Sequence, residues 1–503
     1  MSEAPLQGSA SVAGTRRGAD SFGAGARVLG RTGLTVSPVS FGAARVRDDA
    51  PLHRRALADA LRGGVNLIDT SAHATGGSSE RLVGRMLANL VQHGELRREQ
   101  VVVITRVGQA RGADLATLCA AAPDDELVEL GEDRGHCIHP DFLRAQLDQS
   151  LERLGLQRLD VVLLHDPELF TVDATFTVEA LEDRLRRAFE ALEGWVEEGR
   201  IGAYGVSSNG FAEPVDSPRS TSVARMVELA AEVAGDGHHF SVARMPLNLF
   251  ELGALQPRAG APSNLDAAAA ADIGVLTHRS LEALVERGEE TSLVRLADVP
   301  EAGGDLDVAA GVLARVRKLE AEWAMGLGQQ LMVGPGENAV DLFRWGQELA
   351  PRLSSMGLEQ WTRLRHDVIA THLGRTSAAL LAALEGETRS AFSAWWERYG
   401  TTLHEAFEAI EAALRSARRD LARRVCTALD PQLPAPWRAL PLSNKAILSA
   451  LSAPVSTVAV GMRQPGYVHD VLSLREHPVR LLGASAGPLD FVAVREAMDT
   501  VTA

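Results

Sequence analysis

The chain has 503 residues, more than one domain usually contains, so we expect two structural units. Its 46% hydrophobic and 23% charged residues are typical of a soluble globular protein, and a formal net charge of −15 argues against a nucleic-acid partner. The three cysteines, Cys119, Cys137 and Cys426, are scattered and form no CxxC pair, which argues against disulfides and a metal site. No apolar run is long enough for a membrane span. We therefore expect a cytoplasmic protein.

The first 26 residues are rich in glycine, alanine and serine. They lack the apolar core of a secretory signal, and the pair Arg16-Arg17 is followed by no apolar stretch. We therefore expect residues 1–26 to form a flexible tail.

From about residue 38, short β-branched runs alternate with longer amphipathic stretches. The runs are almost continuously apolar, as in parallel strands that are covered on both faces. Alternation of this kind repeated eight times favours a closed (β/α)8 TIM barrel, whereas a doubly wound open sheet is the alternative. The eight candidate strands are Pro38 to Gly42, Asn66 to Asp69, Val101 to Thr105, Leu159 to His165, Ile201 to Ser207, Phe240 to Arg244, Ile273 to Thr277 and Thr457 to Gly461.

The strand rhythm stops after about residue 284, and helix-forming residues dominate from roughly 305 to 430. Six of the seven tryptophans also fall between residues 300 and 440. We interpret residues 291–439 as an inserted all-helical domain before the eighth strand, within a barrel made of residues 27–290 and 440–503. A packing seam in this domain is predicted at Leu403, Phe407, Ile410, Leu414, Ala417 and Leu421.

Active sites of such barrels lie at the carboxyl ends of the strands. Polar residues end most of the predicted strands, so we expect them to meet at one rim. The residues at these positions are Asp69, Arg106, His165, Ser207, Arg244, His278 and Gly461.

Several motifs occur in the order found in the aldo-keto reductase family, which the sequence resembles. They are Leu29 to Leu34, as an N-terminal β-hairpin, Asn66 to Ser71, Leu159 to His165, Gly205 to Asn209, and Gly461 to Arg463. The resemblance implies hydride transfer between a nicotinamide and a carbonyl. His136 to Pro140 and Gly461 to Val468 resemble a bacterial and plant subgroup of this family that also carries late helical insertions.

The resemblance also implies catalytic residues. The family's Asp and His fall at Asp69 and His165, its Tyr at Ala74 and its Lys at Arg106. Alanine has no proton to give, and a general acid is typically worth about 10²–10⁴-fold in rate. Arg106 keeps the charge that pairs with Asp69, either in catalysis or as a structural ion pair, and His73 is the candidate replacement acid.

By the same resemblance, cofactor contacts fall at Ser207, Ser208, Asn209, Arg244, His278, Gly461 and Arg463. Arg463 favours a 2′-phosphate, so NADP(H) is the expected cofactor and NAD(H) the alternative. Three functions stay open: an oxidoreductase acting on a small carbonyl or alcohol with an altered proton donor, a catalytically impaired barrel that binds a nucleotide or a partner, and lyase or isomerase chemistry using His165 and His73. The insertion is expected to serve as a lid or as an oligomer or protein contact.

Overall fold

Eight parallel strands close into a barrel in the computed structural model of the chain, which describes residues 5–502 except 24, 121–122, 124–125, 132, 259, 288–289, 298–302, 335–336 and 477–488. The strand order around the barrel is β3, β4, β5, β9, β10, β11, β12 and β17. All eight predicted strands are present, and the predicted barrel is confirmed. Their bounds are Val39–Gly42, Leu67–Asp69, Val102–Val107, Leu159–His165, Ile201–Ser207, Phe240–Pro246, Gly274–His278 and Thr457–Val460.

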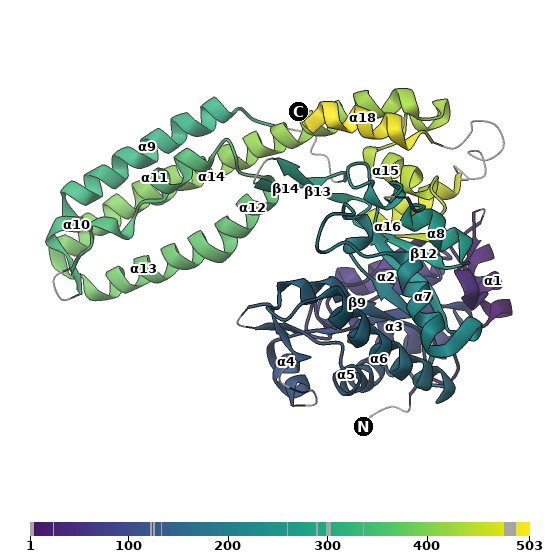
Figure 1. Cartoon of the computed structure of the whole chain (residues 1–503). Helices are drawn as coiled ribbons and strands as arrows, with labels where there is room; N and C mark the ends of the chain where they lie inside the picture. The colour runs from purple at the N-terminus through teal and green to yellow at the C-terminus, as the bar shows by residue number, and fades with distance from the viewer. Residues whose placement is uncertain are drawn as a thin grey trace. The chain divides into compact units, whose positions relative to one another are not determined.

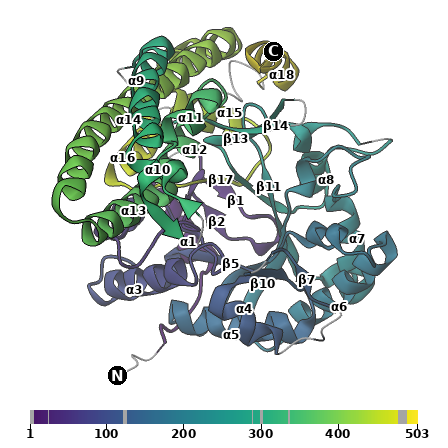
Figure 2. The same cartoon turned by 90° about the vertical axis from the view of Figure 1, so that its left-hand side faces the viewer.

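Amphipathic helices cover the outside of the strands, as Figure 2 shows for α3, α5, α6 and α7. Their apolar residues recur on one face, which packs against the barrel, and their polar residues face outward. The bounds are α2 Pro51–Arg62, α3 Ser78–Gln92, α5 Pro140–Leu154, α6 Val178–Glu197, α7 Val223–Ala234, α8 Asn264–Ala270, α15 Leu442–Leu451 and α16 Pro465–Leu472.

The predicted N-terminal hairpin, β1 (Arg27–Val28) and β2 (Thr35–Val36), fills the amino-terminal end of the barrel. Leu29, Leu34 and Val36 are buried in one cluster with inward-facing residues of the strands. Because side chains alternate between the two faces of a strand, the barrel interior receives every second residue, such as Val102 and Ile104. A pocket lined by residues such as His73 and Asp166 lies at the opposite, carboxyl-terminal end of the strands.

The expectation of a flexible tail over residues 1–26 is wrong for its central part. Residues Val12–Asp20 form helix α1. Ser11 caps its N-terminus, because its side chain accepts a hydrogen bond from the backbone N–H of Gly14. A Cβ at Gly14 would lie 2.3 Å from the carbonyl oxygen of Glu99, so the glycine allows close packing on the barrel. The small residues of this segment, whose composition suggested flexibility, therefore form the face of α1 that contacts the barrel.

Asp160 holds the segment before α1 against the barrel. Its Oδ1 accepts a hydrogen bond of 2.7 Å from the backbone N–H of Ala10, and its Oδ2 accepts bonds from Val103 N (2.7 Å) and Arg98 Nη2 (2.8 Å). Asp160 and Arg98 are both buried. This ion pair ties the N-terminal segment to the outer side of β5 and β9.

A small three-stranded sheet rises from the third βα connection of the barrel. It consists of β6 (Gln109–Arg111), β8 (Arg134–His136) and β7 (Val128–Glu129), in that order, with helix α4 (Gly112–Cys119) after β6. His136 is buried, and its Nε2 lies 3.0 Å from the carbonyl oxygen of His165. The sheet is thus fixed to the end of β9.

The chain divides into two compact units (Figure 1). The barrel unit contains residues 1–285, 294–296 and 429–503, and the helical unit contains 286–293 and 297–428. The boundaries expected from the sequence, 291 and 439, stay predictions. A hairpin of β13 (Glu282–Arg287) and β14 (Glu290–Arg295) follows β12.

Long helices dominate the helical unit, with a core of aromatic residues around Trp323, Trp361 and Tyr399. The predicted seam is buried from Leu403 to Leu414, but Ala417 is exposed. The unit also holds a short hairpin, β15 (Met332–Gly334) and β16 (Glu337–Asn338), so it is not entirely helical. Its helices are α9 Leu306–Met325, α10 Leu327–Gln330, α11 Trp345–Leu349, α12 Leu358–Arg363, α13 Ala370–Ala383 and α14 Gly386–Leu429.

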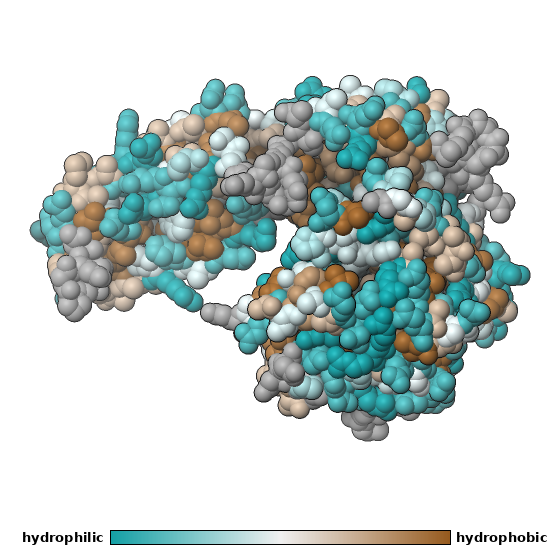
Figure 3. All heavy atoms as spheres, in the orientation of Figure 1, coloured by the Kyte–Doolittle hydropathy of each residue, from teal (hydrophilic) through white to brown (hydrophobic). Residues whose placement is uncertain are grey.

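Hydrophobic residues on the visible face of the helical unit lie scattered among hydrophilic ones (Figure 3). Among the described residues, no helix combines the length and the apolar character that crossing a membrane would require. A last helix, α18 (Phe491–Thr502), belongs to the barrel unit.

Candidate active site

The register of the barrel brings polar strand ends side by side. Ser207 on β10 pairs with His165 on β9 and with Arg244 on β11. In parallel strands with this register, the carboxyl ends lie at the same rim. Three of the residues predicted from sequence therefore occupy one layer of the site.

Asp69 is the centre of a buried ion-pair network. Arg244 Nε lies 3.0 Å from Asp69 Oδ2, and Arg106 Nε lies 3.6 Å from Asp69 Oδ1. Arg244 also donates to Ser207 Oγ (3.2 Å), and Arg106 donates to the carbonyl oxygen of Thr70 (3.2 Å). Asp69, Arg106 and Arg244 are all at most 6% exposed. Two guanidinium groups thus share the carboxylate of Asp69.

Sequence reasoning placed Arg244 among the cofactor contacts, but it binds Asp69 in the structure. Burial lowers the pKa of Arg244 to about 10, with the positive charge of Arg106 as the second cause. The side chain nevertheless stays charged at neutral pH. Its long reach across the barrel could not be read from its position at a strand end.

Two imidazole rings meet at the rim. The centroids of His73 and His165 are 4.8 Å apart, and His165 Nδ1 lies 3.3 Å from Asp166 Oδ1. Burial, and next the positive charge of Arg106, lower the pKa of His73 to about 3. The pKa of His165 also falls well below its usual value because of burial. Both rings are therefore neutral at neutral pH.

Asp166 and Glu168, which sequence reasoning missed, lie directly after β9. Asp166 adopts a left-handed backbone conformation (φ 47°), which is rare outside glycine and common at functional sites. Its carboxylate accepts hydrogen bonds from Gln109 Nε2 (3.1 Å) and Asn209 Nδ2 (3.2 Å). The sequence signal was present, since Asp166-Pro167-Glu168 continues the predicted strand beyond His165.

Glu168 is buried against the turn after β10. Its carboxylate accepts hydrogen bonds from Ser208 Oγ (2.8 Å) and from the backbone N–H of Asn209 (2.8 Å). Burial raises the pKa of Glu168, and the negative charge of Asp166 raises it further. Burial likewise raises the pKa of Asp166. The two carboxyl groups therefore hold protons to a higher pH than ordinary acids do.

The other predicted cofactor residues divide into two groups. His278 Nε2 lies 3.2 Å from Asn209 Oδ1, and Asn209 donates to Asp166. The backbone N–H of Asp166 donates to the carbonyl oxygen of Ser207 (2.7 Å), and Ser208 donates to Glu168. Gly461 and Arg463 follow β17 instead, where Arg463 is half-buried and is one of the charges that lower the pKa of His53 on α2.

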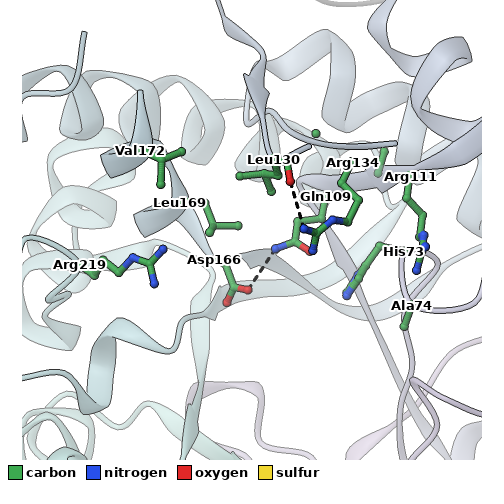
Figure 4. Close-up of a pocket in the computed structure, with 12 residues that line it drawn as sticks. His73, Ala74, Gln109, Arg111, Leu130, Arg134, Asp166, Leu169, Val172 and Arg219 are labelled. Carbon is green, nitrogen blue, oxygen red and sulfur yellow. Dashed lines mark hydrogen bonds between the residues drawn. The ribbon is translucent and has the colours of Figure 1, made fainter. Parts of the chain in front are cut away.

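A pocket of about 430 Å³ opens over this rim (Figure 4). Asp166, His73 and Ala74 line it together with side chains of the small sheet and of the loops after β9 and β10. The pocket includes Ala74, so the position at which the family's tyrosine would fall borders open space. Among the described residues, no three His, Cys, Asp or Glu side chains are grouped to hold a metal ion.

Residues 38–233 match the model of the aldo/keto reductase family, and this segment contains five of the eight barrel strands, β3, β4, β5, β9 and β10.

Over this segment, which is less than half of the chain, the barrel is similar to the aldo/keto reductase family. Curated relatives include L-galactose dehydrogenase from Arabidopsis thaliana, 30% identical over 31% of this chain and 43% of that protein. D-threo-aldose 1-dehydrogenase from a Pseudomonas species is 30% identical over 35% of this chain and 51% of that protein. The chain thus spans about half the length of these relatives. An aldo-keto reductase from Bacillus halodurans, solved in a holo form, aligns over 95% of this chain and 96% of its own at 15% identity, with a TM-score of 0.45.

Proposed function

We propose that the barrel is an NADP(H)-dependent oxidoreductase that acts on a small carbonyl or alcohol with an altered proton donor. The observation that carries this proposal is the pocket at the carboxyl ends of the strands, where His73 and Asp166 lie beside His165. Asp69 and Arg106 lie below them as a buried ion pair. The similarity of residues 38–233 to the aldo/keto reductase family supports oxidoreductase chemistry, and the curated relatives named above are dehydrogenases.

The described residues fit a nicotinamide cofactor at two places. A Cβ at Gly461 would meet no atom within 4 Å, so the backbone after β17 is open to a phosphate, and Arg463 would add a positive charge there. Arg106 Nη2 and His278 Nδ1 are buried ring or guanidinium nitrogens without a hydrogen-bond partner in the described structure. When bound, the nicotinamide would exchange a hydride with the substrate carbon.

Carbonyl reduction also needs one proton for the carbonyl oxygen, and oxidation of an alcohol must remove one. His73 is a poor acid, because its pKa of about 3 leaves the ring neutral, although its N–H can still hold the substrate oxygen by a hydrogen bond. Asp166 is the better donor, because its carboxyl lines the pocket and burial raises its pKa. Gln109 and Asn209 fix the orientation of that carboxyl.

A second candidate function is a nucleotide- or partner-binding barrel without turnover. The specific observation that favours it is the contact of Arg244 with Asp69, because the Asp69 carboxylate is then held by two guanidinium groups, those of Arg244 and Arg106. Buried pairs of this kind also occur as purely structural features. The helical unit would in that case supply a protein contact.

The test combines cofactor binding with turnover. We expect NADPH fluorescence to change on titration with the protein, and a panel of small aldehydes to be reduced at a rate that falls as the pH rises through the raised pKa of Asp166. Asp166→Asn should remove this pH dependence and slow reduction by about 10²–10⁴-fold while NADPH still binds.

Two results would contradict the proposal. The absence of NADPH binding at millimolar concentration refutes the cofactor assignment. Binding without reduction of any aldehyde at any pH favours the non-enzymatic candidate.

A further inference from the structure

Three arginines surround the mouth of the pocket. Arg111 ends β6, Arg134 begins β8, and Arg219 lies in the segment between β10 and α7. Figure 4 shows Arg219 and Arg111 on opposite sides, with Asp166 and His73 between them. Positive groups therefore reach the same space from separate parts of the chain.

The contacts of these arginines are weak. Arg111 Nη2 lies 3.3 Å from Asp133 Oδ2, but both side chains are about half exposed, and such surface pairs contribute little. Arg134 Nη2 donates to the carbonyl oxygen of Leu130 (3.1 Å), which leaves its charge unneutralised. The guanidinium groups thus keep capacity to bind an anion.

Two further guanidinium groups lie deeper in the barrel. Arg106 and Arg244 share the single carboxylate of Asp69. The pKa of His73 is lowered first by burial and then by Arg106, Arg244 and Arg111, so this ring lies in a positive field. The chain as a whole has a net charge of −15, which makes a positive pocket a local feature and not a consequence of composition.

We propose that this pocket binds the carboxylate or phosphate group of an anionic carbonyl substrate, with Arg111, Arg134 and Arg219 as the residues that recognise the anion. The inference rests on the proposed function and adds the substrate class to it. Charged hydrogen bonds from guanidinium groups suit both anions. The single acidic residue of the lining, Asp166, is already bound by Gln109 and Asn209.

The anion recognised here is distinct from the cofactor phosphate. Gly461 and Arg463, the residues proposed for the phosphate end of the cofactor, do not line this pocket. The pocket volume of about 430 Å³ lies in the range of small-molecule sites, so a compact acid with a carbonyl group fits its size.

Binding is measured first, by calorimetry at low salt with the full-length protein. The probes are succinate, its neutral analogue succinamide, and inorganic phosphate. We expect succinate or phosphate to bind and succinamide not to bind. The double variant Arg111→Ala/Arg219→Ala should bind the anion at least about tenfold more weakly. The control variant Arg55→Ala/Arg97→Ala, which removes two exposed arginines outside the pocket, should bind as the wild type does.

Turnover is measured second, with succinic semialdehyde and butanal, which differ in one carboxylate. We expect kcat/KM to be at least about tenfold higher for the charged aldehyde, and the Arg111/Arg219 double variant to lose this preference through KM. In the binding assay, tighter binding of succinate than of phosphate assigns a carboxylated substrate, and tighter binding of phosphate assigns a phosphorylated one.

The two proposals fail in different ways. Equal binding of succinate and succinamide, or equal loss in the control variant, overturns the anion site even if neutral aldehydes are reduced. Anion binding that depends on Arg111 and Arg219, without reduction of any aldehyde, refutes the oxidoreductase and leaves the anion site in place.

Discussion

Acidification should destabilise the barrel through His136, the buried imidazole that fixes the small sheet to β9. Burial lowers the pKa of His136 to about 4 from a reference value of 6.5. The unfolded chain therefore takes up a proton at a higher pH than the folded protein does. The stabilisation that the neutral His136 contributes is fully present above pH 6.5 and is lost as the pH falls toward 4. Between pH 7 and pH 5 this difference corresponds to about 2 kcal/mol.

The variant His136→Gln isolates this effect, because glutamine can keep an N–H donor toward the carbonyl of His165 but cannot titrate. Urea unfolding, followed by circular dichroism at pH 7 and pH 5, gives the free energy of barrel unfolding for each protein. The wild type should lose about 2 kcal/mol more than the variant between these pH values. His93→Gln, at the exposed end of α3, should behave as the wild type does. Equal losses in the wild type and His136→Gln would refute the reasoning.

Three further predictions test the site and the packing of the barrel. Ala74→Tyr combined with Arg106→Lys should raise aldehyde reduction at least about tenfold if only the proton donor is missing, because Ala74 borders the pocket; unchanged kcat would mean that the site differs more deeply. Asp160→Asn should lower the free energy of unfolding by about 3–5 kcal/mol, measured in urea, since it breaks a buried ion pair; a loss below 1 kcal/mol would contradict this. Gly84→Ala should cost about 1–3 kcal/mol in the same assay, because the new Cβ would lie 2.2 Å from the carbonyl oxygen of Leu154; unchanged stability would disprove this close contact.

The barrel strands could be predicted because burial on both faces makes each of them a continuous apolar run, as in Leu159–His165. The small sheet could not be predicted in the same way. Its strands have two or three residues and include charged ones such as Arg111 and Arg134, so they show no apolar periodicity. Two of the three arginines of the pocket, Arg111 and Arg134, were missed with it.

The composition of a site is readable from sequence, but the reach of long side chains is not. The sequence left open a pair between Asp69 and Arg106, and their side chains lie 3.6 Å apart on the neighbouring strands β4 and β5. The contact of Arg244 with Asp69 joins strands far apart in the chain, and only the curvature of the closed barrel brings them together. Helix α1 was missed for a related reason, because its stability comes from tertiary contacts at Gly14 and not from helix propensity.

The separation of the last barrel strand from its neighbours has a consequence during synthesis. About 180 residues lie between the end of β12 and the start of β17, which a ribosome adds in about 10 to 35 s at typical rates. Until β17 emerges, β12 and β3 each present an unpaired edge, and such edges promote aggregation. Nascent chains arrested before Thr457 should therefore depend on chaperones more strongly than chains that have passed it.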